Sequence, residues 1–158
     1  MSTIYYGAYG ANLNQEQMRI RCPVAKPLEG ICLVDRMLVF RGVADILTIP
    51  GNTTPVGIYA ITKACERSLD RYEDYPCLYF KEYLDVELNC GPSKIMIYVM
   101  CERYGFGKPA DEYFKIIRQG YDDWKFDCGI LFSALQHSIS NDRGTSYRSP
   151  RWNDKTAD

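Results

Sequence analysis

The chain has 158 residues, a formal net charge of −1, and contents of 46% hydrophobic and 25% charged residues. This length suits one domain with a sizeable core, and the near-zero charge excludes a general electrostatic attraction to nucleic acid or to an acidic membrane surface. The sequence contains no cleavable apolar N-terminal segment and no apolar run long enough to span a bilayer. We therefore expect a cytoplasmic protein, monomeric or homodimeric, with no nucleic-acid or membrane partner.

Seven cysteines are dispersed along the chain, and no two of them have C-x-x-C spacing. His137 is the only histidine, so the sequence offers little to a zinc site. We expect reduced, mostly buried thiols. No cluster of metal ligands is visible, and we expect no metal or organic cofactor.

The first predicted elements are a strand, a turn and a helix. Residues 4–9 are rich in β-forming isoleucine and tyrosine, and residues 10–12 are small and polar. The helix is predicted over Gln15–Arg21, with Asn12 or Asn14 as its N-cap. A strand that passes through glycine into a helix start presents unpaired N–H groups, which can bind carboxylates. The alternative is a plain strand–turn–helix start without a ligand.

A β-rich region follows and then a change of period. The expected strands are Leu28–Phe40 with a break at Asp35-Arg36, Ala44–Ile49 and Val56–Ile61, and residues 50–55 have the composition of a turn. A helix is predicted over Lys63–Tyr72, with Thr62 as its N-cap and Tyr75-Pro76 after its end.

A hairpin is predicted next, with arms Leu78–Leu88 and Lys94–Cys101 and a loop over residues 89–93. The register that buries most apolar side chains places Phe80 and Leu84 on the same face as Ile95 and Val99. Because side chains alternate along both arms, Tyr79 and Tyr98 would then share the opposite face.

The last predicted elements are two helices and a polar tail. The first helix is predicted with Asp111 as its N-cap and ends at Gly120, a residue typical of the position after a helix. The second covers Asp127–His137. We expect one domain over residues 1–139, and a polar, loose tail over residues 140–158.

Three stretches resemble one known family. Tyr9-Gly10-Ala11-Asn12-Leu13 resembles the Y-G-S-N-L signature of the γ-glutamylcyclotransferase-like (AIG2-like) proteins. Gly42–Ile46 is similar to the second strand of that family, and Ser68–Pro76 resembles its L-D-x-x-E-G segment. The resemblance covers roughly residues 4–137. It implies a single mixed α/β (α+β) domain, in which a curved, mostly antiparallel sheet closes toward a barrel and helices pack outside it.

The resemblance also implies a reaction. The free α-amine of a γ-glutamyl group attacks its own γ-amide carbon, and 5-oxoproline and an amine or amino acid are released. Glu73 matches the catalytic glutamate and would act as general acid and base. The substrate-binding residues implied are Tyr6, Gly7, Ala8, Tyr9, Gly10, Ala11, Asn12, Leu13, Tyr79, Tyr98 and Tyr113. For each tyrosine, the alternative is an ordinary core residue.

The chain departs from the family pattern at two positions. Ala11 replaces the usual serine, so the hydroxyl that could help to hold a substrate is missing. Asp74 replaces the glycine after the glutamate; its carboxylate could raise the pKa of Glu73 or could face water. Two further functions therefore stay open: an acyl or aminoacyl transfer in the same pocket, and a non-catalytic protein that binds a small molecule.

Overall fold

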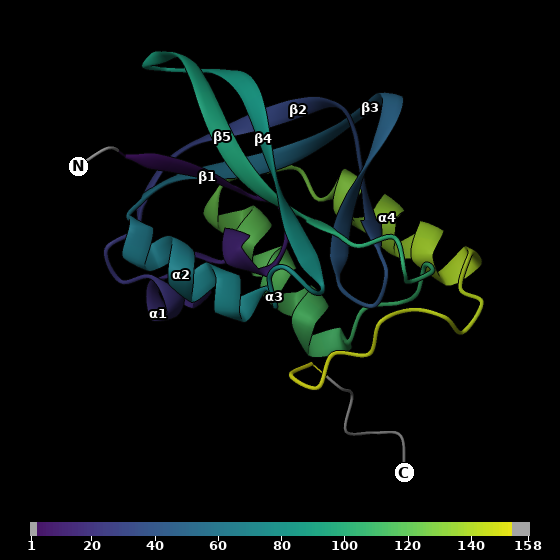
Figure 1. Ribbon diagram of the computed structural model, residues 1–158. Helices are drawn as coiled ribbons and strands as arrows, with labels where there is room; N and C mark the ends of the chain where they lie inside the picture. The colour runs from purple at the N-terminus through teal and green to yellow at the C-terminus, as the bar shows by residue number, and fades with distance from the viewer. Residues whose placement is uncertain (1–2, 153–158) are drawn as a thin grey trace.

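Five strands form one mixed sheet in the computed structural model, in the order β2-β3-β1-β5-β4 (Figure 1). The structure describes residues 3–152. The strands are β1 Ile4–Ala8, β2 Lys26–Phe40, β3 Ala44–Ile61, β4 Tyr79–Leu88 and β5 Gly91–Met100. β1 pairs with β5 in parallel, and every other neighbouring pair is antiparallel. The predicted fold class, a single mixed α/β domain with a mostly antiparallel sheet, is confirmed.

The sheet curves but does not close, which corrects the expectation of a barrel. Its edge strands β2 and β4 are joined by side chains in place of a backbone ladder. Arg36 on β2 donates two hydrogen bonds to Glu82 on β4, at 2.6 and 3.1 Å. The Glu29 carboxylate on β2 accepts from the backbone N–H of Asn89, in the turn after β4. A closed barrel needs continuous backbone pairing around the sheet, and these contacts only bridge the gap.

Residues 50–55 lie within β3, so the predicted turn is wrong. Asp35 alone on β2 lies opposite residues 49–52 of β3, and the strand pairing resumes on both sides of this bulge. The N–H of Gly51 donates to the Asp35 carboxylate at 2.9 Å, and both residues have a positive φ. The chain reverses instead at residues 41–43, between β2 and β3. The predicted break at Asp35 is confirmed.

The helices are α1 Gln15–Arg21, α2 Lys63–Tyr72, α3 Asp111–Asp123 and α4 Gly129–Ser140, and a 3-10 turn, η1, covers Ala11–Leu13. The first two match their predicted bounds. Their caps are also confirmed, because Asn14 accepts from the N–H of Gln17 at 3.0 Å and Thr62 accepts from the N–H of Cys65 at 3.2 Å. α4 lies two to three residues later than the predicted helix at both ends.

Gly120 does not end α3, which corrects the prediction at this residue. The helix continues to Asp123. A Cβ atom on Gly120 would lie 2.6 Å from the backbone nitrogen of Asn14 and 2.7 Å from the carbonyl carbon of Leu13. The glycine therefore permits close contact between α3 and η1, and its reason is packing rather than a helix cap.

The β4–β5 hairpin has the predicted register. Phe80 pairs with Val99 and Leu84 pairs with Ile95, so Tyr79 and Tyr98 share the other face. The loop is shorter than predicted, because β5 begins at Gly91. β5 lies between β1 and β4, and its side chains are buried on both faces over residues 95–98. One face thereby directs tyrosines toward the same region of the molecule.

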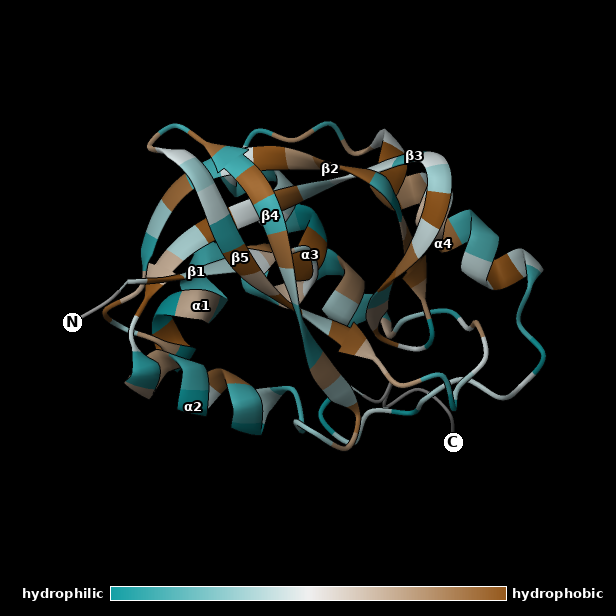
Figure 2. Ribbon diagram, turned by 45° about the horizontal axis from the view of Figure 1, so that its top comes forward, coloured by the Kyte–Doolittle hydropathy of each residue, from teal (hydrophilic) through white to brown (hydrophobic). Residues whose placement is uncertain are grey.

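Apolar residues concentrate in the central strands, whereas the outer turns of α2 and the loop after α4 are hydrophilic (Figure 2). The largest fully buried side chains include Tyr59, Phe40, Ile97 and Ile117. Across residues 3–152, no helix combines the length and the apolar character needed to cross a membrane.

The seven cysteines are free thiols, but they are not mostly buried as predicted. Only Cys22 and Cys65 are buried. Cys32 is exposed because it lies on the edge strand β2, and Cys77 and Cys90 are exposed because they lie in turns. Cys101 and Cys128 are half-buried.

Residues 141–152, hereafter the C-terminal segment, return from α4 along the lower side of the domain in Figure 1. The N–H of Tyr147 donates to the carbonyl of Arg41 at 3.0 Å, and the carbonyl of Thr145 accepts from the N–H of Gly105 at 3.1 Å. The described part of the predicted polar tail is therefore hydrogen-bonded to the domain. Residues 153–158 lie outside the described residues.

Three glycines make room for this segment. A Cβ atom on Gly42 would lie 1.8 Å from the carbonyl oxygen of Tyr147. A Cβ on Gly105 or Gly107 would lie 2.2 Å from the hydroxyl oxygen of Thr145 or Ser146, respectively. The path of the C-terminal segment is thus matched by the absence of side chains on the surface beneath it.

Candidate active site

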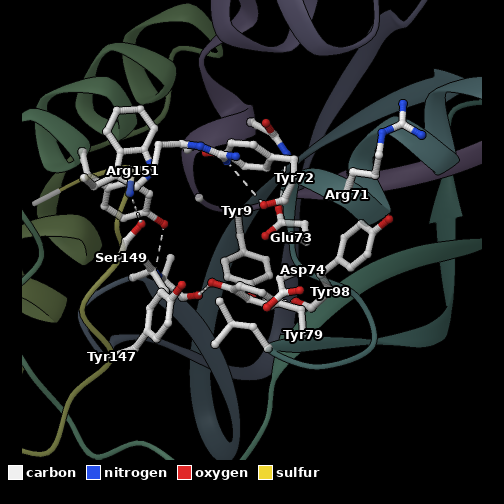
Figure 3. A pocket seen from close by; sticks show the side chains of 18 of the residues that line it. Tyr9, Arg71, Tyr72, Glu73, Asp74, Tyr79, Tyr98, Tyr147, Ser149 and Arg151 are labelled. Atoms are coloured by element: carbon white, nitrogen blue, oxygen red, sulfur yellow. Dashed lines mark hydrogen bonds between the residues drawn. The ribbon is translucent and has the colours of Figure 1, made fainter.

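A pocket of about 260 Å³ opens between η1, the end of α2 and the C-terminal segment (Figure 3). Its size is close to the lower end of the range for small-molecule sites, roughly 300–1,000 Å³. The predicted site residues that line it are Tyr6, Gly7, Tyr9, Gly10, Ala11, Asn12, Glu73, Tyr79, Tyr98 and Tyr113. The fold therefore brings together residues that are far apart in the sequence.

Two predicted residues, Ala8 and Leu13, do not line the pocket. Ala8 is almost fully buried at the end of β1, where it packs in the hydrophobic core. Leu13 is fully buried at the end of η1. Both residues pack in the core beside the pocket.

Glu73 lies immediately after α2, and its N–H closes the helix by donating to the carbonyl of Leu69 at 2.8 Å. The residue is half-buried, with its carboxyl group directed into the pocket (Figure 3). Burial raises the pKa of Glu73 to about 7, although the nearby positive charges of Arg21 and Arg151 oppose the rise. A carboxyl with this pKa can both accept and donate a proton near neutral pH.

Asn12 links the turn to this glutamate. Its side-chain amide donates to Glu73 Oε1 at 3.4 Å and to the hydroxyl of Tyr6 at 3.0 Å. Arg21, at the end of α1, donates to the other side of the amide, Asn12 Oδ1, at 3.0 Å. Because that bond fixes which end of the amide carries the oxygen, Arg21 directs the Asn12 NH₂ group toward Glu73.

η1 is held in place through its carbonyl groups. The hydroxyl of Tyr59 donates to the carbonyl of Asn12, and the indole of Trp124 donates to the carbonyl of Leu13, each at 2.8 Å. The N–H groups of residues 10–12 have no acceptor among the described residues. They therefore remain available to a ligand at the point where Gly10 lets it approach the backbone closely.

The tyrosines around the pocket differ in whether their hydroxyl groups donate or accept hydrogen bonds within the protein. Tyr9, Tyr79 and Tyr98 donate to the Tyr98 carbonyl, the Ala44 carbonyl and the Asp70 carboxylate, respectively. Tyr6 accepts from Asn12, and Tyr113 accepts from the N–H of Ala44 at 2.9 Å.

Burial raises the pKa of Tyr6 and Tyr113 well above the usual value, so both hydroxyls stay protonated at neutral pH. Since neither proton has an acceptor among residues 3–152, Tyr6 and Tyr113 can still donate to a ligand. Tyr113 is well placed for this, because its hydroxyl lies near Gly10.

Asp74 is exposed, and it is not among the causes of the raised pKa of Glu73. The sequence left open whether Asp74 raises the pKa of Glu73 or faces water, and the structure fits a carboxylate that faces water. Arg41 and Asp45 form an ion pair at 3.0 Å outside the pocket lining, and Asp45 accepts from the N–H of Met100. Asp45 thereby joins β3 to β5.

Sequence reasoning missed one wall of the pocket. The C-terminal segment supplies Tyr147, Ser149, Pro150, Arg151 and Trp152, and the remaining lining residues are Val43, Ala44, Arg71, Tyr72, Asp74 and Leu78. Arg21 was missed as well. The sequence gives no spacing signal for either, although the glycines at positions 42, 105 and 107 mark the path of the wall.

Within the described part of the chain, no three side chains of the His, Cys, Asp and Glu types lie close enough to hold a metal ion. The polar groups that line the pocket are the carboxyls of Glu73 and Asp74, tyrosine and serine hydroxyls, an amide, backbone N–H groups and arginines. The lining is therefore rich in hydrogen-bond donors, and it contains one carboxyl whose pKa is raised toward neutrality.

The fold and the pocket together define a mixed α/β protein with a small, donor-rich pocket that contains one carboxyl of raised pKa, that of Glu73. The chain belongs to the γ-glutamyl cyclotransferase, AIG2-like family, whose model matches residues 6–125. Both the turn at residues 9–13 and Glu73 lie within the matched region. Family and fold support a γ-glutamyl cyclotransferase-like function for this chain.

Solved structures show the same fold. One, described as a γ-glutamyl cyclotransferase, is 23% identical with a TM-score of 0.71, and the match covers 95% of each chain. An uncharacterised protein from Homo sapiens is also 23% identical, with a TM-score of 0.70 over 96% of each chain. YkqA from Bacillus subtilis is 20% identical with a TM-score of 0.73, over 91% of this chain and 57% of that one. No curated protein matches the chain.

Proposed function

We propose that the protein is a γ-glutamylcyclotransferase in which Glu73 is the general acid and base. The observation that carries the proposal is the position of this carboxyl. It lies 3.4 Å from the Asn12 amide of the family signature, and its pKa is raised to about 7. A group that is partly ionised at neutral pH can take a proton from the substrate ammonium and later return it to the leaving nitrogen.

The remaining groups would hold the γ-glutamyl part in the attacking conformation. The N–H groups of residues 10–12 and the hydroxyl of Tyr113 are donors that can bind the α-carboxylate or the oxyanion that forms at the γ-carbon. The α-amine then attacks the γ-amide carbon, the carbon–nitrogen bond of the amide breaks, and 5-oxoproline and a free amine leave. The amine and the amide belong to one molecule, so the protein does not need to bring two reactants together. It only needs to hold the amine in the orientation that lets it attack the amide carbon.

The test is to incubate the protein with a panel of γ-glutamyl amines and γ-glutamyl amino acids and to measure 5-oxoproline. We expect turnover of at least one compound, and a loss of at least about 100-fold in Glu73→Gln, as is typical when a general acid–base group is removed. Glu102→Gln is the matched control, because Glu102 is exposed and outside the pocket. Turnover by Glu73→Gln at the wild-type rate would contradict the proposal.

Two other outcomes point to the functions left open by the sequence. Mass spectrometry that finds a joined product and no 5-oxoproline would indicate acyl or aminoacyl transfer. Thermal stabilisation by a γ-glutamyl compound without any product, equal in the wild type and Glu73→Gln, would indicate a non-catalytic binding protein.

A further inference from the structure

The pocket has a buried end and an exposed end. Ala11 and Asn12 are almost fully buried, at 5% and 2% exposure. Arg151 is exposed and belongs to the wall that the C-terminal segment supplies. On the proposed function, the γ-glutamyl part must occupy the buried end, where Glu73 and the free N–H groups lie. The group to be released therefore lies against the exposed end.

Arg151 is positioned at that end by its neighbours. Its backbone N–H donates to the hydroxyl of Ser149 at 3.2 Å, and the ring of Trp152 packs on that of Tyr113, with centroids 5.6 Å apart. The side chain extends toward Tyr72 in Figure 3, and its guanidinium lies 4.3 Å from the centre of the Tyr72 ring. The positive charge of Arg151 is thus held beside Tyr72, the residue that precedes Glu73.

Most of the hydrogen-bonding capacity of Arg151 is unused. A guanidinium has five N–H donors in a planar fork that matches a carboxylate. The side chain of Arg151 makes one hydrogen bond to the described residues, a long one of 3.4 Å to the carbonyl of Tyr72. Arg71 also lines the pocket, but it extends away from Glu73 in Figure 3 and donates to Ser68. Arg151 is therefore the cation that is positioned to meet an anionic ligand.

We propose that Arg151 binds the carboxylate of the released group, so that the substrates are γ-glutamyl amino acids rather than γ-glutamyl amines. The inference rests on the proposed function and deepens it. A released amine without a carboxylate would leave the guanidinium without a partner. A released amino acid carries its carboxylate on the carbon next to the leaving nitrogen, two bonds from the atom that Glu73 protonates.

The experiment compares two substrates that differ by that carboxylate alone, γ-glutamyl-L-alanine and γ-glutamylethylamine. We expect the wild type to prefer the alanine compound. Arg151→Met should reduce kcat/KM for the alanine compound by about tenfold more than for the ethylamine compound, mainly through KM, because a hydrogen bond to a charged group is removed. Arg151→Lys, which keeps the charge, should recover part of the preference.

The ratio of the two kcat/KM values isolates the carboxylate. Removal of Arg151 also removes a charge that lowers the pKa of Glu73, but that effect is common to both substrates and cancels in the ratio. Arg148→Met is the matched control, because Arg148 is exposed in the same segment and does not line the pocket. Its ratio should equal that of the wild type.

Each result has one reading. A ratio that is unchanged in Arg151→Met, with both substrates turned over, overturns the inference and leaves the proposed function standing. An equal loss for both substrates also overturns it, since Arg151 would then act on the part that they share. If the wild type forms 5-oxoproline from neither substrate nor from the wider panel, the proposed function fails, and the inference fails with it.

Discussion

Replacement of Glu73 by glutamine is expected to change the stability of the fold in a pH-dependent way. The pKa of Glu73 is about 7 in the folded protein, whereas that of an ordinary glutamate is near 4.5. Between these values the folded carboxyl keeps a proton that the unfolded chain has lost. The wild type therefore loses stability as the pH rises from about 4.5 to about 7, and the loss is complete above that range.

The magnitude follows from the size of the pKa rise. A rise from 4.5 to about 7 would correspond to about 3 kcal/mol if the group were fully shielded, because one unit of pKa shift is worth about 1.4 kcal/mol. Glu73 is only half-buried and faces an open pocket, so solvent screens part of the cost. We expect Glu73→Gln to gain about 1–2 kcal/mol relative to the wild type on going from pH 4 to pH 8.5.

The assay is urea unfolding of both proteins at several pH values between 4 and 9. All other titrating groups are shared, so they cancel in the difference between the two free energies of unfolding. Glu102→Gln serves as control, and its difference from the wild type should stay constant with pH. A constant difference for Glu73→Gln as well would refute the reasoning, since it would show that burial does not perturb this carboxyl.

Two further predictions concern the supports of the site. Arg21→Met removes a charge that lowers the pKa of Glu73, so the acid limb of the kcat/KM profile should move to higher pH; an unmoved limb would exclude this role. Gly42→Ala should destabilise the protein by at least about 1 kcal/mol in thermal or urea unfolding, because its Cβ meets the Tyr147 carbonyl at a positive φ. Gly144→Ala is the control with the same kind of φ but open space, and an equal loss there would contradict the clash.

The local features of the fold could be predicted from the sequence. α1 and α2 and their caps follow from short-range patterns, and the β4–β5 register follows from alternation. The features that depend on contacts between distant parts of the chain could not be predicted in this way. Gly120 has the composition signal of a helix end, but its role is set by contact with η1, which lies about a hundred residues earlier. The glycine and prolines of residues 50–55 mark a bulge because β2 continues to pair beside them.

The residues of the site also fall into those that the sequence could indicate and those that it could not. Glu73 and the turn at residues 9–13 carry motifs, so the sequence located both and predicted that they would meet. Arg21 and the C-terminal segment carry none. A polar terminal stretch has the composition of a loose tail whether or not a surface exists to receive it, and that surface is assembled from residues 41–42 and 105–107 only in the folded chain.

On the inference that Arg151 binds the released group, the C-terminal segment sets the choice of substrate, whereas Glu73 and the turn at residues 9–13 carry the proposed chemistry. The family model ends at residue 125, whereas the wall formed by this segment begins at Tyr147. The carboxyl, the turn and the sheet that holds them can therefore stay the same while a stretch of some six residues changes its charge and shape. If the inference holds, exchange of this stretch alone should change which groups are released, while Glu73 and the turn at residues 9–13 stay in place.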